Sequence, residues 1–72
     1  MVEERFTNRR NWAARCNDLE LVPRWRDHDE RWVLLATNME RRACAVWNPE
    51  TDQGVVVSEM TPDDFRNPVP LP

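Results

Sequence analysis

The sequence contains no lysine and no tyrosine, and it has a single histidine, a single serine and a single glycine. Acid–base and nucleophilic catalysis depend on such side chains being held close together, so most of the usual catalytic equipment is missing. Gly54 alone cannot form a glycine-rich phosphate-binding loop. Ser58 falls in an expected strand and His28 in an expected turn, away from each other. We therefore predict a protein that is not an enzyme and that holds no cofactor.

Cysteine is scarce as well, with only Cys16 and Cys44, far apart in the chain. Without a CxxC motif or paired histidines, one chain offers too few ligands for zinc. The stretch 27–29, Asp-His-Asp, contains possible metal ligands. However, neighbouring side chains on a hairpin tip point in different directions, so they do not converge on one ion. We expect no metal and two buried, reduced thiols, with a disulfide as the less favoured alternative. Reduced thiols fit a cytoplasmic location.

Long apolar runs are also missing. No window approaches the roughly 18 apolar residues of a membrane span, and the first residues, MVEERFTNRR, carry charges where a signal peptide needs an apolar run. We expect no membrane partner. The 72 residues are 40% apolar and 32% charged, which is typical of one folded domain. That domain is expected over residues 1–67, followed by an extended proline-rich tail over residues 68–72.

All basic charge comes from ten arginines, which stand against 13 acidic residues and leave a net charge of -3. An acidic chain argues against a surface that follows phosphates, although a local basic patch stays open. The arginine bias fits selection for forked contacts to carboxylate or phosphate. It also fits a GC-rich genome, the interpretation we favour, and this suggests a bacterial or phage source.

The spacing of apolar residues predicts one helix and four strands. The segment 7–18 has one apolar helical stripe with Thr7 as its N-cap, although Arg9 falls into that stripe. Four runs, LELVPRWR, RWVLLAT, RACAVW and VVVSEM, have strand patterns and are separated by turn residues. The motif MTPDDF predicts a helical turn over residues 62–66. The expected fold is α+β: an N-terminal helix, a four-stranded antiparallel meander and a short C-terminal helical turn.

Hairpin register predicts a row of tryptophans across three strands. A four-residue loop over residues 27–30 places Trp25 opposite Trp32, and a turn at residues 39–40 places Trp32 opposite Trp47. The other face of the sheet is apolar too and needs a cover. Three covers are open: curling of the sheet towards a small barrel, the C-terminal segment folding back, or a second chain, which includes a homodimer.

The functional expectation is reached by elimination. We expect a small regulator or inhibitor that binds a larger host protein complex, for example RNA polymerase or a nucleic-acid-guided defence complex, because a standard interface needs only about 800 Å² from each partner. Arginine and tryptophan dominate binding hot spots, so the expected contacts are Arg24, Arg26, Arg31 and Trp47. The alternative is a nucleic-acid-binding module that uses arginine and tryptophan side chains, and it requires exposed tryptophan rings.

Overall fold

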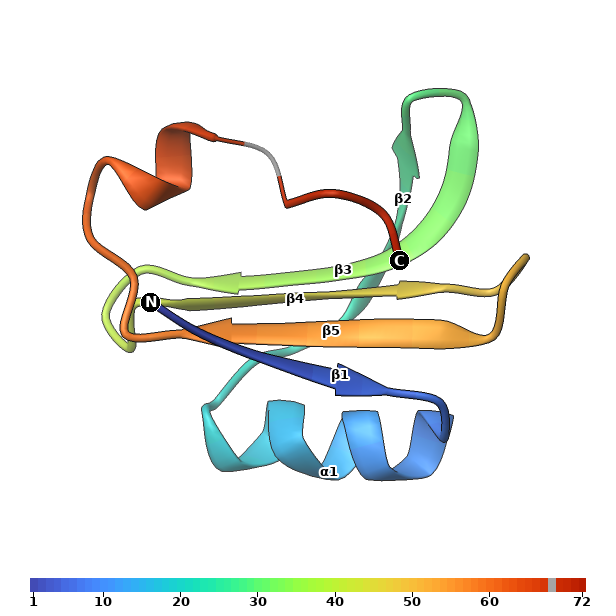
Figure 1. Ribbon diagram of the computed structural model, residues 1–72, viewed down its shortest axis with the longest axis horizontal. Coiled ribbons are helices and arrows are strands. Elements are labelled where there is room, and N and C mark those ends of the chain that lie inside the picture. The colour runs from blue at the N-terminus through green and yellow to red at the C-terminus, as the bar shows by residue number, and fades with distance from the viewer. Residues whose placement is uncertain (68) are drawn as a thin grey trace.

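The computed structural model describes residues 1–67 and 69–72. In chain order the elements of this part are β1 (Val2–Phe6), α1 (Arg9–Asp18), β2 (Arg24–His28), β3 (Arg31–Asn38), β4 (Ala43–Asn48), β5 (Gln53–Ser58) and the 3₁₀ turn η1 (Asp64–Arg66). The strands form one antiparallel sheet in the order β1-β5-β4-β3-β2. Figure 1 shows α1 on one side of this sheet and the C-terminal segment on the other. The predicted α+β class and the meander of β2 to β5 are confirmed.

The strand that precedes the helix is the main departure from the predicted fold. β1 pairs with β5 along its whole length, from Val2 opposite Ser58 to Phe6 opposite Gly54. Its sequence, VEERF, is charged at three of five positions, so it lacks the apolar alternation by which strands are recognised. The prediction of four strands after an N-terminal helix was therefore wrong: the sheet has five strands, and the helix follows the first.

The helix begins at Arg9 rather than at residue 7, because Asn8 and not Thr7 is its N-cap. The side-chain oxygen of Asn8 accepts a hydrogen bond from the backbone N–H of Asn11 at 3.1 Å, which satisfies one of the free donors at the helix start. Arg9, which was expected to conflict with the apolar stripe, lies exposed in the first turn. Because Arg9 is the first residue of the helix and its side chain stays exposed, its position in the stripe buries no charge.

Apolar clusters cover both faces of the sheet. The face under α1, which we call the helix face, holds Trp12, Cys16, Leu21, Leu34, Ala36, Ala43, Ala45, Trp47 and Val56. The opposite face, which we call the tail face, holds Val33, Cys44, Val46, Val55, Val57 and Met60, with Leu35, Phe65, Val69 and Leu71 packed against them. The C-terminal segment thus provides the cover that the second face needs. The sheet stays open rather than closing into a barrel, since β1 and β2 lie at its two edges.

The described part of the proline-rich tail lies against the tail face. The predicted tail starts at Pro68, which lies outside the described residues. From residue 69 onward the chain runs back over the sheet (Figure 1). The side chains of Asn48 and Thr51 donate hydrogen bonds to the carbonyl oxygen of Pro72 at 3.1 and 3.0 Å. Residues 69–72 are therefore part of the packed unit.

Candidate interaction surface

The hairpin formed by β2 and β3 turns at two residues, Asp29 and Glu30. Their φ angles of 55° and 66° are those of a type I′ turn, which requires positive φ at both central positions. The predicted four-residue loop was wrong, and the pairing shifts by two residues, so that Trp25 lies opposite Leu34 instead of Trp32. A two-residue shift leaves each side chain on its predicted face.

The register of β3 against β4 differs in the same way. The connecting loop has four residues, 39–42, rather than two, and Trp47 lies opposite Leu34 instead of Trp32. Trp47 is only 2% exposed and packs against Trp12, with 5.8 Å between the ring centroids. The predicted row of three tryptophans is therefore wrong. Trp47 belongs to the core and is not available as a surface contact.

Trp25 and Trp32 form a second, exposed aromatic pair on the helix face. Because the residue opposite Trp32 is Asp27, the two indoles are diagonal neighbours on adjacent strands. Their rings stack with centroids 6.1 Å apart and planes 2° from parallel, yet the residues remain 41% and 59% exposed. The helix packs over β1, β4 and β5 and leaves this corner uncovered. The guanidinium of Arg9 lies 5.8 Å from the Trp25 ring centroid, within cation–π range.

The three predicted arginines lie together on the tail face of the same hairpin. Strand positions alternate between faces, so these arginine side chains project from the tail face, whereas Trp25 and Trp32 project from the helix face. All three are exposed. Arg31 Nη1 lies 3.2 Å from Glu50 Oε2, whereas the ion pairs among the described residues include neither Arg24 nor Arg26. The structure thus brings the predicted arginines together and separates them from Trp47.

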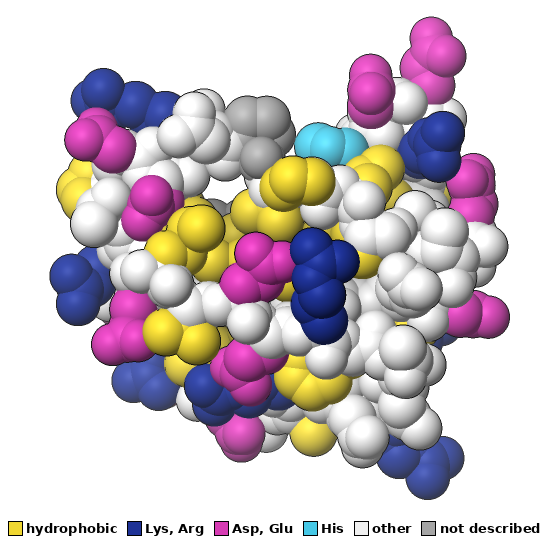
Figure 2. All heavy atoms as spheres, viewed as in Figure 1, with side chains coloured by type: hydrophobic (Ala, Val, Ile, Leu, Met, Phe, Trp, Pro, Cys, Tyr) yellow, Lys and Arg dark blue, Asp and Glu magenta, His cyan; other side chains and the backbone are white. Residues whose placement is uncertain are grey.

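A half-open cavity of about 420 Å³ lies on the tail face, with His28 and Leu35 of the same hairpin in its wall. Figure 2 shows the hollow between the C-terminal segment and the sheet, with hydrophobic side chains around it. Its lining is Leu35, Met39, Cys44, Ala45, Val46, Met60, Phe65 and Val69, with His28, Thr37 and Asn67 as polar members. His28, expected in a turn, is instead the last residue of β2 and is half-buried in this wall. One imidazole among apolar groups supplies no catalytic arrangement.

Both cysteines are free and buried, on opposite faces of the sheet. Burial raises the pKa of the Cys16 thiol to about 12 and also raises the pKa of Cys44, so both thiols stay protonated at neutral pH. In residues 1–67 and 69–72, no group of three or more His, Cys, Asp and Glu side chains is placed to hold a metal ion. The α-helix of that part is too short and too polar to cross a membrane.

The sequence analysis predicted a row of three tryptophans without deciding whether the row is core or contact surface, and it found that Arg9 conflicts with the apolar stripe. It therefore did not single out Trp25 and Trp32 as an exposed pair with Arg9 as its cationic neighbour. One signal was present. Pro23 has no N–H and therefore marks the following strand as an edge strand, where tryptophans are only half covered. The contact of Arg9 with Trp25 joins the helix start to the edge strand, and no spacing in the sequence indicates it.

Comparison of the chain with protein-family models, curated proteins and solved structures finds no match. The candidate site therefore rests on the geometry of the hairpin. It combines an exposed aromatic pair on one face, arginines on the other and an edge strand between them. Exposed tryptophan and arginine side chains are the residues that most often anchor binding interfaces.

Proposed function

We propose that the protein is a small, non-enzymatic interaction module that binds a larger protein through the β2–β3 hairpin and alters the activity of that partner. The observation that carries the proposal is the stacked and exposed pair Trp25–Trp32. Tryptophan is enriched in binding hot spots, and covering apolar surface contributes about 25 cal/mol per Å². Because the two indoles already stack against each other, their side-chain conformations are restricted before binding, and little further entropy is lost when a partner covers them.

The expected partner is a large host assembly of a bacterium, such as RNA polymerase or a nucleic-acid-guided defence complex, and the module is a cytoplasmic bacterial or phage protein. The arginine-only basic composition and the two buried thiols support this setting. A standard interface of about 800 Å² per partner would cover about a sixth of the 5027 Å² surface of the chain. The hairpin and the neighbouring helix start can provide such an area.

A nucleic-acid-binding module is the second candidate, because exposed aromatic rings beside arginine are also the means by which single strands are bound. The exposure of Trp25 and Trp32 and the position of Arg9 favour it. Asp27, however, shares the helix face with the two indoles and places a negative charge where a phosphate would pass. Together with the net charge of -3, this makes a protein partner the better candidate.

The test is a double variant, Trp25→Ala/Trp32→Ala, with Met39→Ala as matched control. Met39 is an exposed apolar residue in a different loop, 61% accessible. Partners are recovered from bacterial lysate with and without nuclease, identified by mass spectrometry, purified, and titrated against each variant. We expect the tryptophan variant to bind at least about tenfold more weakly and the control to bind as the wild type. Recovery that requires nucleic acid, with salt-sensitive binding to bare RNA or DNA, would instead establish the second candidate.

A further inference from the structure

β2 is an edge strand that pairs only with β3 in the part of the chain that the structure describes. In a hairpin closed by a two-residue turn, the residues beside the turn form a hydrogen-bonded pair, and such pairs recur at every second position. The backbone groups of Arg24 and Arg26 therefore point towards β3, whereas those of Trp25 and Asp27 point away from the sheet. Unpaired N–H and C=O groups of this kind are a template for another strand. Pro23, which has no N–H, ends this template.

The other edge strand, β1, carries charges that are already paired. Glu3 Oε1 lies 2.9 Å from Arg5 Nη2, and Glu4 Oε1 lies 2.9 Å from Arg15 Nε. The two arginines of β2 have no such ion pair among the described residues, although both are exposed on one face. The charge of β1 is thus neutralised within the chain, while the charge of β2 is available to a partner.

A second copy of this chain would fit the β2 edge badly. Antiparallel pairing of β2 with itself continues the sheet, so the arginines at positions 24 and 26 of both copies would line one surface. Like charges on neighbouring strands destabilise such pairing. A neighbouring strand with carboxylates opposite Arg24 and Arg26 would instead neutralise both guanidiniums. The forked donors of a guanidinium match the geometry of a carboxylate. Charge complementarity therefore selects an acidic segment of a different protein.

We infer that the edge of β2 takes up an extended acidic segment of the partner protein as an added antiparallel strand. This inference rests on the proposed function and names the kind of partner segment. Acidic side chains of the segment face Arg24 and Arg26 on the tail face. On the helix face an apolar side chain lies beside Trp25, and a basic one lies beside Asp27. Read from its N-terminus, the segment has the pattern basic, acidic, apolar, acidic.

The probe is a capped peptide with Lys-Glu-Phe-Glu at its centre and threonines on both sides. Binding is followed by amide resonances of the protein, and we expect saturable shifts centred on Trp25 and Asp27. A peptide with both glutamates changed to lysine is expected to bind at least about tenfold more weakly. A peptide N-methylated at its central lysine and phenylalanine should also bind at least about tenfold more weakly than the acidic peptide, because these N–H groups donate to β2. Absence of saturable shifts, or equal binding of all three peptides, would overturn the inference.

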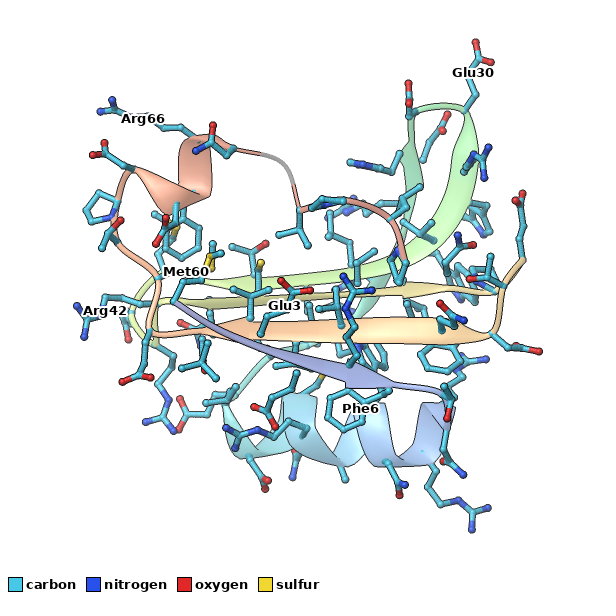
Figure 3. All side chains as sticks on the ribbon, in the orientation of Figure 1. Glu3, Phe6, Glu30, Arg42, Met60 and Arg66 are labelled. Atoms are coloured by element: carbon cyan, nitrogen blue, oxygen red, sulfur yellow. The ribbon has the colours of Figure 1, made fainter. Side chains whose placement is uncertain are left out.

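A charge exchange tests the arginines directly. The variant Arg24→Glu/Arg26→Glu is expected to lose affinity for the acidic peptide. It should gain affinity for the peptide with lysines in place of the glutamates. The matched control is Arg42→Glu/Arg66→Glu, which makes the same charge change at the end of the molecule away from the hairpin tip at Glu30 (Figure 3). The control should bind the acidic peptide as the wild type does. Dispersion of amide resonances reports whether each variant is folded.

The outcomes separate this inference from the proposed function. If the tryptophan variant loses the purified partner while Arg24→Glu/Arg26→Glu retains it and the acidic peptide does not compete, the hairpin is the interface but strand addition is wrong. If neither variant changes partner binding, both ideas are wrong. If the acidic peptide is inert and a single-stranded oligonucleotide binds through the same arginines, the edge serves a nucleic acid and the inference is overturned.

Discussion

At the scale of single residues, the only glycine of the sequence is explained by two tryptophans. A Cβ atom added to Gly54 would lie 2.4 Å from Cε3 of Trp47 and 2.7 Å from Cδ1 of Trp12. Neither ring is free to move aside, because both are buried and Trp12 Nε1 donates a hydrogen bond to the carbonyl oxygen of Val55 at 3.0 Å. Gly54 therefore makes room for the packing of α1 on β5.

Gly54→Ala is expected to lower the free energy of unfolding by about 2 kcal/mol, within the range for overpacked cores. Strand propensity alone predicts the opposite sign, since glycine weakens strand interiors. Denaturant unfolding followed by circular dichroism measures the change. Ser58→Ala, in the same strand, serves as control and should have a smaller effect. A variant that is as stable as the wild type would show that the two indoles do not close on this position.

The two buried thiols are expected to make the stability of the protein depend on pH in the alkaline range. Because lysine and tyrosine are absent, cysteines are the side chains that titrate between pH 9.0 and about 12. The pKa of Cys16 is raised by burial from 9.0 to about 12, so above pH 9.0 the unfolded chain releases a proton that the folded chain keeps. Stability is therefore fully present below pH 9.0 and falls as pH rises towards the folded pKa. Cys44 acts in the same direction.

We expect the free energy of unfolding to fall by about 1.4 kcal/mol per pH unit between pH 9.0 and about 12 from Cys16, with Cys44 adding a loss in the same direction. Urea titrations at a series of pH values measure this dependence. Cys16→Ala/Cys44→Ala is the control, because it removes both titrating groups and should lose the pH dependence even if it is less stable overall. An unchanged alkaline loss in that variant would contradict the assignment.

At the scale of elements, the sequence predicted which segments are strands better than it predicted how they are joined. Six charged residues adopt left-handed backbone angles, with φ between 51° and 66°: Glu20, Asp29, Glu30, Arg42, Asp52 and Glu59. Turns of this kind are normally recognised by glycine or asparagine. Both hairpin loops were therefore given wrong lengths, and both registers were shifted by two residues. Each strand residue still lies on its predicted face of the sheet, because a register shift of two residues does not exchange the faces.

β1 was missed for a different physical reason. Its residues have no strand pattern of their own, and pairing with β5 makes them a strand. The arginine part of the candidate site could be predicted because alternation places Arg24 and Arg26 on one face of their strand, and any even shift of the hairpin register keeps Arg31 on that face. The aromatic part was not, because the distinction between buried Trp47 and exposed Trp32 depends on register and on the position of the helix.

The type I′ turn offers a direct test of backbone strain. Glu30 has a φ of 66°, and Figure 3 shows its side chain at the hairpin tip, pointing into solvent. Glu30→Gly is expected to raise the free energy of unfolding by about 1 kcal/mol, because the Cβ atom costs about that much in the left-handed region. Glu40→Gly is the control, since Glu40 is not among the residues with positive φ and should be destabilised by glycine. Urea unfolding that places both variants below the wild type would contradict this account.

At the scale of the whole molecule, a helix and an irregular segment enclose a two-sided sheet. The radius of gyration of 11.0 Å is about that expected for a compact chain of this length. Residues 69–72 replace a second helix as the cover of the tail face, with alternate residues packed inward. The second chain that was considered as a cover is thus not needed to bury this face. The interaction surface proposed above lies on the remaining exposed corner, at the β2–β3 hairpin.

The alternation in the tail predicts what happens when the cover is removed. Val69 and Leu71 pack on the tail face, whereas Pro70 between them is exposed. Val69→Asp/Leu71→Asp is expected to lower the free energy of unfolding by about 2 kcal/mol, because two half-buried apolar side chains are lost from the cover. The uncovered sheet face should also bind a hydrophobic dye and increase self-association with concentration.

Pro70→Asp is the matched control, since it places a carboxylate in the same segment but on its solvent side. Urea unfolding, dye fluorescence and sedimentation at several protein concentrations measure the three effects. The double variant should differ from the wild type in all of them, and the control in none. If the two variants behave alike, the tail does not cover the sheet, and the apolar residues of that face must be buried by another chain.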